Sequence, residues 1–266
     1  MLAELFAPNV ITALLICVAA AAATMIGGFS VFTTRDSNPR ILAFGLAFAG
    51  GAMVYISLVE IFWKSLSSFS EIAPDKQAYT QATIAFFAGV AILALIDRLI
   101  PNPHNRLTVP DGEESKKYLK RVGLLAALAI TVHNIPEGMA TFFAALEDPV
   151  LGSSLAFAIA VHNIPEGVSI AIPVYYATQN KKLTLLACSV SAIAEPLGAI
   201  LGYLVLAPFL SAYVFGAVFG AIAGAMVFLA MDELLPTAKR YASGHDSVYG
   251  MVIGMACIAL SLVLFR

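Results

Sequence analysis

A six-residue motif rich in potential metal ligands occurs twice in this sequence. His-Asn-Ile-Pro-Glu-Gly occupies residues 133–138 and recurs without change at 162–167. On a helix, positions i and i+3 or i+4 share a face, so the histidine, asparagine and glutamate of each copy can converge. Imidazole, amide and carboxylate groups, without a thiolate, suit Zn²⁺, Fe²⁺, Mn²⁺ or Co²⁺ rather than Cu⁺. The repeated motif predicts a site for a divalent transition metal.

A third glutamate, Glu195, also stands in an apolar stretch, directly before a proline. A carboxylate at the centre of a membrane helix costs about 2.5–3.5 kcal/mol on insertion scales. No lysine or arginine occurs within 122–145, 151–177 or 183–231, so the three acids require protons or a bound cation. Hydrogen bonds that merely tie helices together are the alternative, but they do not account for three unpaired acids. The candidate ligands, for one ion or for two that share a carboxylate, are His133, Asn134, Glu137, His162, Asn163, Glu166 and Glu195.

The composition places these residues in an integral membrane protein. Of the 266 residues, 60% are hydrophobic and 12% are charged, with a mean hydropathy of +0.87. A soluble domain has about 45–50% apolar and roughly 25% charged residues. Soluble enzymes, nucleic-acid-binding proteins and disordered chains are therefore excluded.

Apolar runs of about 20 residues, the length that crosses a bilayer, define the expected helices. The run from 183 to 231 is too long for one crossing, and the Pro-containing segment 207–211 is a turn signal that divides it into two spans. With the other runs this makes an all-α polytopic protein of eight transmembrane helices in a single domain, residues 1–266. The other six runs are 8–32, 41–63, 78–97, 122–145, 151–177 and 247–265.

The distribution of basic residues sets the orientation. With both termini outside, 12 of the 15 lysines and arginines lie on the inner side, as the positive-inside rule requires. The hydrophilic loop at about 98–121 is then cytoplasmic. The two motif histidines lie about 16–18 Å from the outer ends of their helices, close to the middle of a hydrocarbon layer about 30 Å thick.

A second match relates the second and seventh spans. Gly-Ala-Met-Val-Tyr at 51–55 with Glu60 corresponds to Gly-Ala-Met-Val-Phe at 224–228 with Glu233, at a constant offset of 173. The two spans run in opposite directions, which predicts inverted repeats related by a pseudo-two-fold axis in the membrane plane. Secondary transporters of this design bind their substrate at midplane. The alternative is that Gly-Ala-Met-Val is simply a common sequence in membrane helices.

Further polar residues are candidates for the pathway. Met53 and Met226 stand near mid-depth, where they either offer thioether contacts or pack in the core. Glu60 falls at the outer end of the second span, whereas Asp232 and Glu233 fall at the inner end of the seventh. These acids are either cation-attracting mouths of one pathway or solvated helix ends.

These features together resemble the ZIP (Zrt/Irt-like) family of divalent metal importers. The motif in the fourth span carries the resemblance, and its second copy, with Ala-Glu-Pro at 194–196 and Met-Asp-Glu-Leu-Leu-Pro at 231–236, is similar to the bacterial ZupT-like branch. The resemblance covers essentially the whole chain. It implies a 3+2+3 arrangement of helices, metal uptake toward the cytoplasm, and a central site for one or two metals made by the seven candidate ligands, with Met53 lining the path.

Two departures from the family pattern bear on selectivity. Many eukaryotic members carry His-Glu-x-Pro-His-Glu in the fifth span, where this chain has Asn163 and Gly167, so a strict preference for zinc is not implied. The cytoplasmic loop lacks the histidine run frequent in the family, so metal sensing by the loop is not expected.

The sequence thus predicts a secondary transporter of a bacterial inner membrane that imports Zn²⁺ and also Fe²⁺, Mn²⁺ and Co²⁺. It would have no prosthetic group, since the metal is the substrate. Its partners would be the ions and the lipid bilayer but not nucleic acid, and a homodimer is left open. A metal exporter with the same site is one alternative, and an intramembrane metallohydrolase that activates water is another.

Overall fold

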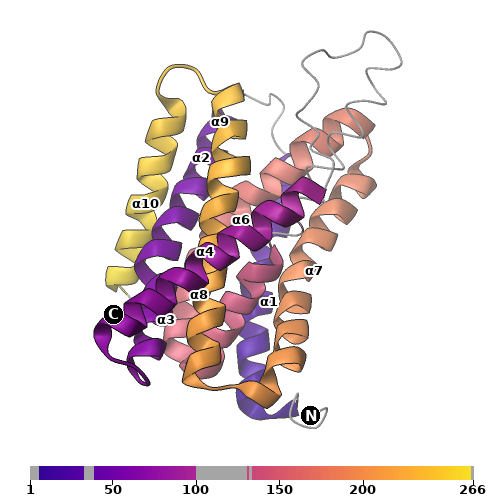
Figure 1. Ribbon diagram of the computed structural model, residues 1–266. Helices are drawn as coiled ribbons and strands as arrows, with labels where there is room; N and C mark the ends of the chain where they lie inside the picture. The colour runs from indigo at the N-terminus through magenta and orange to yellow at the C-terminus, as the bar shows by residue number, and fades with distance from the viewer. Residues whose placement is uncertain (1–5, 33–38, 100–130, 132–133, 265–266) are drawn as a thin grey trace.

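A computed structural model describes residues 6–32, 39–99, 131 and 134–264, which are almost entirely helical and contain no strand (Figure 1). The all-α prediction is therefore confirmed. The helices are α1 (Pro8–Ser30), α2 (Pro39–Ile56), α3 (Phe62–Ser70), α4 (Asp75–Leu99), a helix over residues 134–147, α6 (Pro149–Thr178), α7 (Lys181–Leu206), α8 (Ala212–Leu229), α9 (Leu235–Tyr241) and α10 (Asp246–Leu264).

Seven helices in the described part of the chain are long and apolar enough to cross a membrane. They correspond to every expected span except the fourth, of which residues 122–130 and 132–133 lie outside the described residues. The described remainder of that span is helical. The protein is therefore a multi-pass membrane protein.

The long apolar run is divided where its turn signal predicted. α7 ends at Leu206 and is followed by a short 3₁₀ helix, Ala207–Phe209. α8 then starts behind Ser211, whose hydroxyl accepts a hydrogen bond from the amide of Val214 and so caps the new helix.

The internal repeat extends to whole structural elements. α2 continues into α3 through a π-helical turn at Ser57–Ile61, and α8 continues into α9 through another at Ala230–Leu234. The starts of α1 and α7, both bounds of α2 and α8, and both bounds of the two π turns each differ by 173 residues. Figure 1 shows the α2–α3 span running in the opposite direction to the α8–α9 span.

Neighbouring helices are exchanged between the two copies in a matching way. α2 packs against α10, and its equivalent α8 packs against α4. A Cβ on Gly51 would lie 2.1 Å from the carbonyl oxygen of Met251, and one on Gly224 would lie 1.9 Å from that of Phe86. Glycine is required at both places because the neighbouring backbones touch. The matching contacts are those expected of a pseudo-two-fold relation between the first and last three spans.

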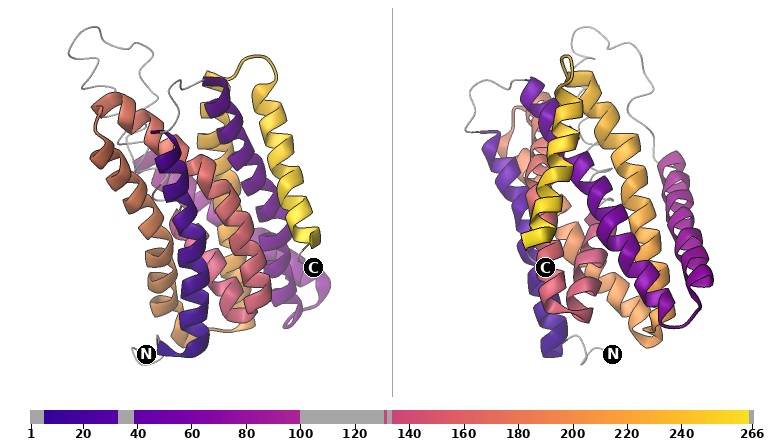
Figure 2. Two further views of the ribbon diagram at one scale, coloured as in Figure 1. Left: turned by 180° about the vertical axis from the view of Figure 1, so that it is seen from behind. Right: turned by 90° about the vertical axis from the view of Figure 1, so that its left-hand side faces the viewer.

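α1 begins and α10 ends toward the same end of the bundle, which we call the N-terminal end (Figures 1 and 2). α3 lies at this end and α9 at the opposite one. The 3+2+3 grouping and the location of the termini outside the cell stay predictions.

Candidate metal centre

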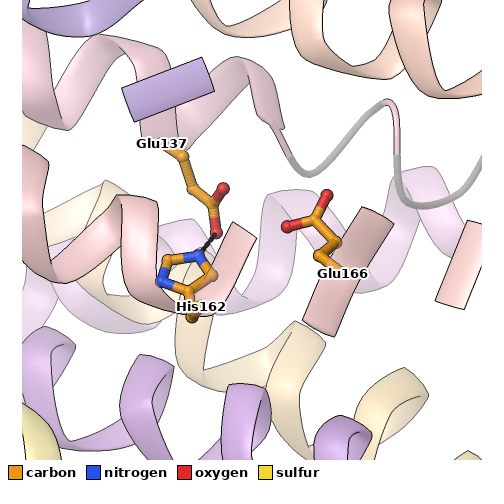
Figure 3. Close-up of side chains that lie close together, drawn as sticks. All are labelled: Glu137, His162 and Glu166. Carbon is orange, nitrogen blue, oxygen red and sulfur yellow. Dashed lines mark hydrogen bonds and ion pairs between the residues drawn. The ribbon is translucent and has the colours of Figure 1, made fainter. Parts of the chain in front are cut away.

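Three of the predicted ligands meet inside the bundle. Glu137 from the helix 134–147, together with His162 and Glu166 from α6, offers ligand atoms that all lie within 4.8 Å of one another. His162 Nε2 is 3.0 Å from Glu137 Oε1. All three side chains are buried, and Figure 3 shows the two carboxylates converging from separate helices. The two copies of the motif therefore contribute to one site.

Glu195 joins this site from α7. Its Oε1 accepts a hydrogen bond of 2.7 Å from Asn163 Nδ2, which also donates to the carbonyl of Ala20 at 3.1 Å. In the other copy of the motif, Asn134 Nδ2 donates to the carbonyl and the hydroxyl of Ser191, at 2.9 and 3.1 Å. Both asparagine amino groups are thus held by α1 and α7, and each amide oxygen is left without a hydrogen.

The motif glycines bring α1 and α7 this close. A Cβ on Gly138 would lie 1.9 Å from the carbonyl oxygen of Glu195, and one on Gly167 would lie 2.0 Å from that of Thr24. Small residues in membrane helices let backbones approach in this way. The motif therefore supplies ligands and also the close packing that places Glu195 beside Asn163.

A set of buried acceptor atoms without partners marks the centre. In the tautomer that donates from Nε2 to Glu137, His162 keeps a free lone pair on Nδ1. An unsatisfied buried polar atom costs about 1–3 kcal/mol, and a cation would satisfy several of these at once. The atoms that have no hydrogen-bond partner among the described residues are Asn134 Oδ1, Glu137 Oε2, His162 Nδ1, Asn163 Oδ1, Glu166 Oε1 and Glu195 Oε2.

Six of the seven predicted ligands therefore lie together on three helices. The seventh, His133, lies outside the described residues and stays a prediction. The sequence did not single out Ser191, the partner of Asn134, because one serine on an apolar helix carries no distinguishing signal.

The predicted pathway residues lie away from the centre. Met53 and Met226 are fully buried in the apolar core, and a thioether contact to a passing ion stays a prediction for both. Glu60 is buried in the first π turn, on the N-terminal side of the bundle. Asp232 and Glu233 stand in the second π turn, toward the opposite end, and their carboxylates lie within 4.8 Å of that of Asp97.

Asp97 and Lys64 are two charged residues whose placement the sequence analysis missed. The signal for Asp97 was its position at the inner end of the third span, the same side as Asp232 in the predicted topology. Lys64 is buried in α3, where its ammonium lies 3.5 Å from Glu147 Oε2 and 5.7 Å from the ring centre of Phe219. Glu147 ends the helix that carries Glu137, so this ion pair connects α3 to that helix.

Comparison with known proteins gives consistent matches. The model of a family described as ZIP Zinc transporter matches residues 101–262. A Neisseria meningitidis serogroup C protein named Zinc transporter ZupT is 59% identical over 261 residues, 97% of each chain. Proteins of the same name from Stenotrophomonas maltophilia strain K279a and Chlorobaculum parvum are 58% identical over 261 residues, 97% of each chain, and 44% identical over 250 residues, 91% of this chain and 93% of that protein.

Proposed function

The chain belongs to the ZIP zinc transporter family, and we propose that it is a secondary transporter that imports Zn²⁺ across a bacterial inner membrane through the centre described above. ZIP proteins are transporters and not enzymes, so the metallohydrolase alternative is discarded. The observation that carries the proposal is the group of six buried acceptor atoms without partners, contributed by both copies of the motif and by Glu195.

The charge of the centre suits a divalent cation. Glu137, Glu166 and Glu195 bring up to three negative charges into a buried region, and the predicted spans around them contain no lysine or arginine. Binding neutral imidazoles and ionised carboxylates requires that the ion displace any protons held there. The motif residues would therefore release protons as the ion binds.

The number of acceptors exceeds what one zinc ion uses. Zn²⁺ in proteins takes four ligands in most sites, and the described residues offer six acceptor atoms. Two ions that share a carboxylate fit this surplus, and so does one ion passed between subsets of ligands. Carboxylate and amide oxygens also suit Mn²⁺ and Fe²⁺, so we propose that these ions and Co²⁺ compete with Zn²⁺.

The acids away from the centre fit the mouths of the same pathway. Glu60 stands in the π turn toward the N-terminal end, which the positive-inside rule places outside. Asp97, Asp232 and Glu233 stand toward the opposite end. Acidic groups at both mouths would raise the local concentration of cations.

Uptake of radiolabelled Zn²⁺ into proteoliposomes of known orientation tests the proposal. Glu137→Ala and Glu166→Ala should each abolish uptake while the purified protein stays folded, because each removes a charged ligand from the centre. Glu71→Ala is the matched control, since Glu71 is an exposed glutamate after α3. If either centre variant keeps near-normal uptake at saturating metal, the assigned site is wrong.

The same vesicles decide direction and selectivity. Flux only from the cytoplasmic to the external face would replace import by the exporter alternative. Competition by unlabelled Mn²⁺, Fe²⁺ and Co²⁺ measures the range of ions, and a lack of competition would restrict the substrate to Zn²⁺.

A further inference from the structure

α1 and α7 hold the two copies of the motif by the same contacts. Asn134 donates to the carbonyl of Ser191 on α7, and Asn163 donates to the carbonyl of Ala20 on α1. The two acceptors are 171 residues apart, two fewer than the offset between the starts of their helices. Around the centre, these contacts define which residues of α1 and α7 are equivalent.

The next turn of each helix extends the equivalence. The carbonyl of Glu195 lies against Gly138, and the carbonyl of Thr24 lies against Gly167. Glu195 and Thr24 are again 171 residues apart. Thr24 therefore occupies on α1 the position that Glu195, a member of the centre, occupies on α7.

The hydroxyl of Thr24 is buried and has no hydrogen-bond partner among the described residues. A threonine in a helix ordinarily donates to the carbonyl four residues earlier. In this protein that bond is made by Thr12, Thr80, Thr83, Thr141, Thr178 and Thr184. For Thr24 the corresponding carbonyl is that of Ala20, which already accepts from Asn163.

The motif therefore occupies the usual partner of this hydroxyl. A buried hydroxyl left without a hydrogen bond costs about 1–3 kcal/mol unless something else satisfies it. The equivalence with Glu195 indicates what that is. Glu195 directs its carboxylate to Asn163, and the equivalent partner of Thr24 is Asn134, whose Oδ1 also has no partner.

We propose that the Thr24 hydroxyl is an oxygen ligand of the transported ion and the α1 counterpart of the Glu195 carboxylate. This inference rests on the proposed metal centre and adds a residue that is absent from both copies of the motif. The two halves of the centre then differ in charge. The half with Glu195 and Asn163 holds a carboxylate, whereas the half with Thr24 and Asn134 offers two neutral oxygens and would bind an ion more weakly.

A spectroscopic test reads the contact directly. In Thr24→Cys protein, purified at full length and titrated with Cd²⁺ alone, a thiolate bound to the metal should produce a new ultraviolet charge-transfer band that saturates with Cd²⁺. The wild type reports the background of Cys17, Cys188 and Cys257. Ser261→Cys is the matched control, because Ser261 is a buried hydroxyl without a partner on α10, away from the centre. A Thr24→Cys protein that binds Cd²⁺ without a band above both controls overturns the inference.

Calorimetric titration with Zn²⁺ provides a second test that preserves the shape of the side chain. Thr24→Val, which replaces the hydroxyl by a methyl group, should weaken Zn²⁺ binding by about tenfold, on the scale of lost interactions around metal sites. Thr24→Ser should bind like the wild type. Equal affinity of Thr24→Val and wild type would contradict the proposal.

Glu137→Gln separates the two possible failures in the same titration. If Glu137→Gln loses Zn²⁺ binding while Thr24→Val keeps it, only the role of Thr24 is wrong. If Glu137→Gln binds like the wild type, the proposed centre itself is wrong.

Discussion

Replacing Gly138 with alanine tests how far the centre depends on the contact between two backbones. The added Cβ would lie 1.9 Å from the carbonyl oxygen of Glu195 and 2.6 Å from its Cα. These are backbone atoms, which cannot rotate away as a side chain could. Because ordinary contact begins at 3.4 Å, α7 and the helix 134–147 must separate locally by about 1.5 Å.

The expected loss follows from this displacement. Overpacking of this kind costs about 1–3 kcal/mol of stability. A movement of about 1.5 Å also exceeds what the 2.7 Å hydrogen bond from Asn163 to Glu195 tolerates. With Glu195 misplaced, we expect the affinity for Zn²⁺ to fall by about 10- to 100-fold.

Thermal unfolding in detergent and uptake in proteoliposomes measure the two effects. Gly45→Ala is the matched control, because its Cβ would lie 3.7 Å from that of Pro165, an ordinary contact. This control should transport normally with equal or higher stability, since alanine favours helix more than glycine does. The reasoning is refuted if Gly138→Ala matches the wild type in both assays, or if Gly45→Ala is equally impaired.

Four other outcomes are expected. Asn134→Ala and Asn163→Ala should reduce uptake less than the glutamate variants do, because neutral oxygen ligands contribute less charge; equal losses in a dose-response series would contradict this. Metal affinity should fall as pH is lowered and protons should be released on binding, so a binding enthalpy that is independent of the buffer between about pH 6 and 8 would count against proton displacement. Gly224→Ala should destabilise the protein by about 1–3 kcal/mol, since its Cβ would lie 1.9 Å from a carbonyl oxygen of α4, and an unchanged melting temperature would show that the two helices are not so close. Glu147→Gln should cost no more than about 1 kcal/mol, because its carboxylate is 43% exposed and water screens the pair with Lys64; thermal unfolding that shows a much larger loss would mean the pair is more buried than this.

The spans and most of the centre could be predicted because their signals are local. An apolar run of about 20 residues identifies a membrane helix whatever its neighbours are. The motif repeats in adjacent spans, and helical periodicity alone places Glu137 near its histidine and asparagine. Glu195 could be added because an acid without a basic partner is costly in the membrane.

The other features depend on contacts between distant segments. The carbonyls of Ala20 and Ser191 hold the motif amides, and a backbone carbonyl carries no signal of residue type. Thr24 was overlooked for the same reason, since a threonine in an alanine-rich helix ordinarily bonds within its own helix. The meeting of Asp97 with Asp232 required knowing that α4 packs on α8.

The π-helical turns at Ser57–Ile61 and Ala230–Leu234 bear on the history of the chain. A π turn has hydrogen bonds to the fifth residue along instead of the fourth, and such turns occur mostly as single wide turns within α-helices. They correspond to one added residue. Two separate insertions at equivalent positions would be a coincidence, so the simplest account is a single insertion in an ancestral three-span segment. That segment was then duplicated with its bulge in place, and the copy was retained in the inverted orientation.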